Sequence, residues 1–145
     1  MNDAGADNRA PGKPGPSVTR FETLDFDVRG FDHEAHVYVA WRYLQEFELL
    51  ESISRFRTAL KNLTSSLGKP DKYHETITWF FMIVVAERAT EDAAQDRTAF
   101  RRRNADLFQA DLALVCAHYT QKRLNSAAAK TKFLLPDLIP GTLHR

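Results

Sequence analysis

The residues best suited to chemistry in this chain are histidines that stand close to one glutamate and one tyrosine. His33 and His36 are three positions apart, and Tyr73, His74 and Glu75 are consecutive. Imidazole and carboxylate groups are common protein ligands of zinc, iron and manganese, and they also act as general acids and bases. This composition favours a site that acts on a small organic molecule.

The site hypothesis gives each of these residues a role. A divalent ion (zinc, iron or manganese) would be held by the histidines, which are His33, His36, His74 and His118. Glu75 would be the catalytic base or a further ligand, and Tyr73 would donate to a developing oxyanion. The first interpretation is therefore a small enzyme of the hydrolase or lyase type that uses acid–base or metal-assisted chemistry.

Three long helical patterns are available to position these residues. The segment 32–45 carries its apolar residues and both histidines on one stripe, and Asp32 is a suitable N-cap. The segment 47–67 repeats leucine, isoleucine and phenylalanine at steps of three and four before Gly68 and Pro70 end it. The segment 72–88 is apolar all round, which is typical of a buried helix, and Asp71 is placed to cap it.

The remaining segments are shorter or less regular. Residues 107–120 are amphipathic and predict a fourth core helix, and residues 124–132 predict one more short helix. The segment 133–139 reads as an extended apolar arm, because nearby prolines disfavour a helix. Residues 1–19 predict a disordered tail, and residues 20–145 predict a single domain that opens with an extended segment ending at Gly30.

Short connections between the long helices predict the topology of an all-α, up-down bundle of four main helices with a buried central helix. In such a bundle the first and third helices run the same way, so the ends that carry His33, His36 and His74 lie together. The fourth helix runs in the opposite direction, and its C-terminus would bring His118 to the same end. The site hypothesis rests on this convergence.

Composition narrows the classes of partner. The chain has 145 residues, a formal net charge of +1 and a pI of about 7.9, so no strong field draws it to nucleic acid or to an anionic membrane. We therefore expect a small-molecule substrate and no nucleic-acid or membrane partner, and a homo-oligomer is compatible with the sequence. A single cysteine, Cys116, expected to be a buried small hydrophobe, and the lack of a signal-peptide pattern favour the cytoplasm.

Each site residue also has a structural interpretation. His36 is placed to pack against Phe31 in a hydrophobic staple, and His74 can belong to a helix cap. Glu75 suits the first turn of a helix, and His118 suits the last turn as a cation. Two further hypotheses follow. One is a metal-free small-molecule binder or acid–base enzyme, and the other is a non-catalytic protein-interaction module that uses the apolar arm or an exposed bundle face.

Three stretches carry a resemblance to known sequences: FDHEAHVYVAWRYL at 31–44, KYHETITW at 72–79 and FLLPD at 133–137. They resemble an uncharacterised family of small bacterial helical proteins with H-x-x-H and Y-H-E-T motifs. The resemblance covers most of the chain after Phe31. It implies a helical fold and recurring histidines at His33, His36 and His74, and it implies no particular reaction.

Overall fold

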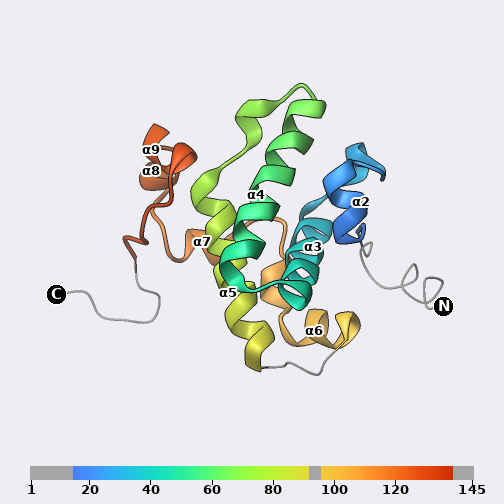
Figure 1. Ribbon diagram of the computed structural model, residues 1–145. Helices are drawn as coiled ribbons and strands as arrows, with labels where there is room; N and C mark the ends of the chain where they lie inside the picture. The colour runs from blue at the N-terminus through green and yellow to red at the C-terminus, as the bar shows by residue number, and fades with distance from the viewer. Residues whose placement is uncertain (1–14, 92–95, 139–145) are drawn as a thin grey trace.

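The computed structural model describes residues 15–91 and 96–138, and all regular structure within these ranges is helical, which confirms the all-α class. Figure 1 shows α4 and α5 in the middle of the molecule, with α2 and α3 on one side and α8 and α9 on the other. Most of the predicted disordered tail (residues 1–14) and the last residue of the predicted arm, Ile139, lie outside the described residues.

The first described helix is α2 (Val18–Thr23), which takes up the last two residues of the predicted disordered tail and the beginning of the predicted extended segment. The Ser17 side chain caps it by accepting from the Arg20 N–H, and Leu24, with a φ of 58°, ends it in the left-handed conformation. Val18 and Phe21 are buried, so this helix is held by packing rather than by intrinsic helix propensity. A short 3₁₀ helix, η1 (Val28–Gly30), leads to α3.

The three long helices agree closely with the predicted segments. They are α3 (His33–Glu46), α4 (Leu49–Ser66) and α5 (Glu75–Glu91), and α5 packs against both of the others. Asp32 is the N-cap of α3, as predicted, because its side chain accepts from the Ala35 N–H at 2.9 Å. Gly68, with a φ of +72°, follows α4 in a conformation that favours glycine, and η2 (Pro70–Lys72) leads to α5.

Two apolar clusters hold these helices together. The first lies among α2, α3 and α4, and its buried side chains include Phe21, Tyr43, Phe56 and Leu60. The second lies between α3, α5 and the segments after α5, and it includes Trp41, Phe81, Phe100, Leu107 and Tyr119. Helix α5 contributes to both clusters, which explains why its sequence is apolar around most of its circumference.

The predicted fourth long helix is not present, so the up-down arrangement of four main helices is not confirmed. The chain after α6 (Arg97–Arg103) forms the short elements η3 (Ala105–Phe108), α7 (Ala113–Cys116), α8 (Gln121–Leu124) and α9 (Ala127–Thr131). Leu112 has a φ of 60°, a conformation that interrupts any continuous helix between η3 and α7. Cys116, in the one-turn helix α7, is exposed, so the expectation of a buried cysteine is wrong.

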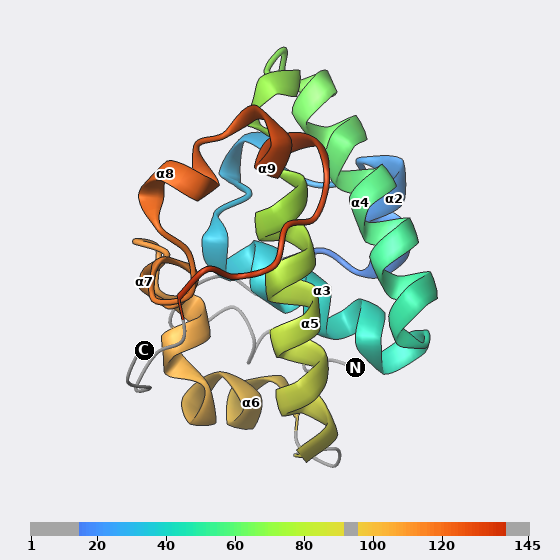
Figure 2. The same cartoon turned by 90° about the vertical axis from the view of Figure 1, so that its left-hand side faces the viewer.

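The segment after α9 follows the surface of α5, as Figure 2 shows. Phe133 stacks on Trp79 with ring centroids 5.3 Å apart, and Thr76 donates to the Lys132 carbonyl at 2.8 Å. The Tyr119 hydroxyl donates to the Leu134 carbonyl at 2.7 Å. These contacts fasten the predicted apolar arm to α5 and to Tyr119, which lies in the connection between α7 and α8. None of the helices in the described ranges combines the length and hydrophobicity needed to cross a bilayer.

Candidate functional site

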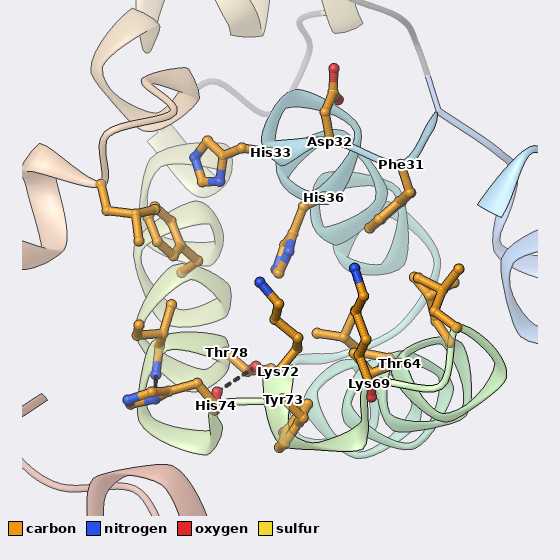
Figure 3. A pocket seen from close by; sticks show the side chains of 16 residues that line it. Phe31, Asp32, His33, His36, Thr64, Lys69, Lys72, Tyr73, His74 and Thr78 are labelled. Atoms are coloured by element: carbon orange, nitrogen blue, oxygen red, sulfur yellow. Dashed lines mark hydrogen bonds between the residues drawn. The ribbon is translucent and has the colours of Figure 1, made fainter. Parts of the chain in front are cut away.

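A pocket of about 430 Å³ lies where the N-terminal ends of α3 and α5 meet the C-terminal half of α4 (Figure 3). Its apolar lining consists of Phe31, Leu60, Leu63, Leu67, Ile77, Phe81 and Leu112. Its polar lining consists of Asp32, His33, His36, Thr64, Lys69, Lys72, Tyr73, His74 and Thr78. The volume is within the range of pockets that hold small organic ligands. We call this cavity the His36 pocket.

His33 has one ring nitrogen committed to the fold. Its Nε2 lies 2.9 Å from the Leu107 carbonyl oxygen. A carbonyl only accepts hydrogen bonds, so Nε2 carries the proton. The ring also meets Phe81 edge-on, with centroids 5.1 Å apart. His33 therefore ties the beginning of α3 to η3 while it lines the pocket.

His36 lines the His36 pocket and has a buried ring nitrogen whose hydrogen-bonding capacity is not used by the described residues. Its ring stacks on Phe31, with centroids 6.2 Å apart, which confirms the predicted hydrophobic staple, and it meets Phe56 edge-on at 5.2 Å. The Nε2 atom is buried and has no hydrogen-bond partner among the described residues. Figure 3 shows the ring pointing from α3 into the pocket.

Burial sets the protonation state of His36. Loss of hydration lowers the pKa of the imidazole from 6.5 to about 3, and the nearby His33, whose ring centroid is 6.1 Å away, contributes to the same shift. At neutral pH the ring is therefore uncharged. It presents a neutral imidazole nitrogen to whatever occupies the pocket.

His74 has both ring nitrogens engaged by the backbone. Nδ1 accepts from the Ile77 N–H at 3.2 Å, which leaves the proton on Nε2, and Nε2 donates to the Leu124 carbonyl at 2.8 Å. The first contact is that of an N-cap, so the residue that caps α5 is His74 and not Asp71 as predicted. His74 joins the beginning of α5 to the end of α8.

Glu75 is buried, with 6% of its surface exposed, and it is surrounded by donors outside the His36 pocket. Its carboxylate accepts from the Tyr73 hydroxyl at 2.5 Å, from Arg57 Nε at 3.1 Å and from Trp79 Nε1 at 2.9 Å. Burial by itself would raise the pKa of Glu75, but these hydrogen bonds and the charge of Arg57 outweigh it and lower the pKa. We call these four residues the Glu75 cluster.

Tyr73 lines the His36 pocket, but its hydroxyl group belongs to the Glu75 cluster. Burial, and secondly the hydrogen bond to Glu75, raise the pKa of the Tyr73 phenol. Glu75 also lines a second pocket, together with Lys61, Asp71 and Ala127 among others. Arg57, the ionic partner of Glu75, comes from α4, and the sequence analysis did not predict this pairing.

His118, the fourth predicted metal ligand, does not line the His36 pocket. Its Nδ1 donates to the Leu114 carbonyl at 3.0 Å, and its ring lies against Phe80 with centroids 5.1 Å apart. The structure thus brings His33, His36 and His74 to one pocket and leaves His118 outside it. In residues 15–91 and 96–138 no group of three or more His, Cys, Asp or Glu residues is arranged to hold a metal ion.

Two lysines complete the pocket, and sequence reasoning did not identify them. Figure 3 shows Lys69 and Lys72, from the connection between α4 and α5, with their amino groups turned toward His36. Asp32 also lines the pocket, but its carboxylate points away from the lysines and caps α3. In the sequence, the only indication of this role is that two basic residues lie close to Pro70. Their positions do not show toward which part of the fold the side chains point.

Comparison with known proteins gives no match, whether the chain is compared with protein-family models, with curated proteins or with solved structures. The resemblance to a bacterial family therefore stays a prediction.

Proposed function

We propose that this protein binds a small organic molecule in the His36 pocket and that its own side chains, without a metal ion, make the contacts. The observation that carries the proposal is the buried Nε2 of His36, which faces a pocket of about 430 Å³ and has no hydrogen-bond partner among the described residues. A buried polar atom without a partner costs about 1–3 kcal/mol. A ligand that supplies the partner removes this cost.

The same geometry favours binding over proton transfer. A general base is most effective when its pKa lies near the working pH, and burial lowers the pKa of His36 to about 3. In the predicted catalytic pair, the Tyr73 hydroxyl donates to the Glu75 carboxylate, so neither group depends on a substrate for a partner. Each of these groups therefore fits a binding or structural role better than a catalytic one.

Metal-assisted catalysis through His33, His36, His74 and His118 stays a prediction with its own test. Both ring nitrogens of His74 already bind the backbone, so ligation would require those bonds to open. We further propose a cytoplasmic location, since the single cysteine leaves no internal disulfide to form in an oxidising compartment.

A fragment screen tests the proposed binding without assuming the ligand. Small organic fragments are added to the ¹⁵N-labelled protein, and amide chemical shifts are followed by NMR. We expect some fragments to move the amides of Phe31, His36 and Leu63, which line the pocket, and to leave those of α6 unchanged. The variant His36→Leu, which keeps an apolar side chain at this position, is expected to lose these responses.

The matched control is His118→Leu, which removes a histidine outside the pocket and should leave the fragment responses unchanged. The same samples are measured for zinc, iron and manganese and after treatment with a chelator. Binding that survives in metal-free protein supports the proposal. Binding that requires a stoichiometric metal, or a complete lack of pocket responses to fragments, contradicts it.

A further inference from the structure

We propose that the molecule bound in the His36 pocket is an organic anion with an apolar body, of the class of small hydrophobic carboxylates. This inference rests on the proposed function and specifies the ligand. It is carried by the juxtaposition of Lys69 and Lys72 with His36 over an apolar floor.

The charges of the pocket are not balanced from within. Lys69 and Lys72 are exposed at the pocket, and neither forms an ion pair with another described residue. Among the described residues that line the pocket, the only carboxylate is that of Asp32, which caps α3 and points away from both amino groups (Figure 3). Two uncompensated cations at one opening attract an anion and disfavour a cationic ligand.

The backbone adds to the same preference. Both α3, which begins at His33, and α5, which begins at Glu75, have their N-terminal ends beside the pocket. The N-terminal end of a helix carries a partial positive charge. His36 is neutral, and in the tautomer that carries the proton on Nε2 its imidazole donates one hydrogen bond to an anionic oxygen.

The apolar lining of the pocket determines which non-polar part of a ligand fits it. Below the charged rim the lining is apolar, with Leu60, Leu63, Ile77 and Phe81 contributed by α4 and α5. A small inorganic anion would leave this surface in contact with water, whereas a hydrocarbon body would cover it. Removal of this apolar surface from water favours binding of the hydrocarbon body. The pocket therefore suits a molecule with one anionic group and several apolar carbons.

Linear and aromatic carboxylates share this chemistry, so octanoate and cinnamate serve as the two probes. Octanol, which has the chain of octanoate without its charge, is the uncharged control. Binding to the full chain is measured by isothermal titration calorimetry at pH 7. We expect one or both carboxylates to bind, and octanol to bind at least tenfold more weakly than octanoate where octanoate is the ligand.

Charge reversal identifies the cations responsible. The double variant Lys69→Glu, Lys72→Glu changes two exposed residues, so it should fold normally, and we expect it to weaken carboxylate binding at least tenfold. The matched control is Lys122→Glu, Lys132→Glu, which makes the same change in net charge at exposed positions outside the pocket. It should leave the dissociation constant within twofold of the unmodified chain.

The result separates this inference from the proposed function. Equal affinity for octanoate and octanol, an unchanged affinity in the Lys69 and Lys72 variant, or pocket responses to neutral fragments with none to either carboxylate overturns the anion specificity and leaves the binding pocket supported. No pocket response to any fragment overturns both. Stronger binding of octanoate than of cinnamate identifies a chain-like body, and the reverse order identifies an aromatic one.

Discussion

The two polar clusters at the beginning of α5 differ in how completely their hydrogen bonds are made. In the Glu75 cluster, a buried carboxylate accepts from Tyr73, Arg57 and Trp79. In the His36 pocket, the buried Nε2 of His36 has no partner among the described residues. A buried polar group with all its partners supports the fold, whereas one without a partner costs stability. We therefore interpret the Glu75 cluster as structural and propose the His36 pocket as a ligand site.

The largest effect should come from removing the centre of the satisfied cluster. The substitution Glu75→Ala leaves the Tyr73 hydroxyl, the Trp79 N–H and the Arg57 guanidinium without their acceptor. We expect the free energy of unfolding to fall by about 3 kcal/mol. Urea unfolding measures the change, with Glu87→Ala as the exposed control on the same helix, expected within about 0.5 kcal/mol of the unmodified chain. A loss as small as that of the control would show that the cluster is not structural.

The next effect is a dependence of stability on pH that originates in His36. In the folded protein the pKa of His36 is about 3, whereas the unfolded chain takes up a proton at its ordinary value of 6.5. The unfolded state binds more protons between these values, so stability is lost as pH falls from about 6.5 toward 3. Between pH 7 and pH 5 the unmodified chain should lose about 2 kcal/mol more than His36→Leu.

Urea unfolding of both proteins at pH 7 and pH 5 measures this difference. His33 faces His36, and Lys69 and Lys72 line the same pocket, but all three are present in both proteins, so their contributions largely cancel. The prediction is contradicted if the two proteins lose the same stability over this range.

A smaller effect should distinguish His36 from His33, because replacing each with leucine should change the free energy of unfolding in opposite directions. At pH 7, His36→Leu removes an unpaired buried nitrogen and should raise the free energy of unfolding by about 1 kcal/mol. The matched variant His33→Leu removes the bond to the Leu107 carbonyl and should lower it by about 1 kcal/mol. Thermal or urea unfolding compares the two. Destabilisation by both would mean that His36 already has a partner in the folded protein.

Local signals in the sequence predicted the long helices well. Asp32 caps α3 and Gly68 follows the end of α4, both as expected. These two positions could be predicted because each residue acts on backbone groups within one helical turn of itself. The amphipathic pattern from Leu107 to Thr120 failed as a guide. It satisfies the helical period, yet Leu112 adopts a left-handed conformation, and tertiary packing decides the outcome for such short segments.

The candidate site was predicted only in part, for a related reason. His33, His36 and His74 come to one pocket because each stands at the beginning of a long helix whose existence the sequence indicates. The predicted position of His118 depended on a fourth long helix that does not form, and His118 does not line that pocket. Hydrogen bonds between distant segments, such as Arg57 to Glu75 and His74 to Leu124, leave no periodic signal in the sequence. The roles of these residues therefore became visible only in three dimensions.

The most direct test of the binding account is ¹⁵N NMR of the His36 imidazole, recorded between pH 5 and pH 8 with and without octanoate. With a pKa of about 3 the free ring should keep the signature of a neutral imidazole across this range, and saturating octanoate should shift its Nε2 resonance. His118, outside the pocket, should show no response to octanoate. A His36 ring that titrates near pH 6.5, or an Nε2 resonance that no carboxylate or fragment moves, would contradict the account.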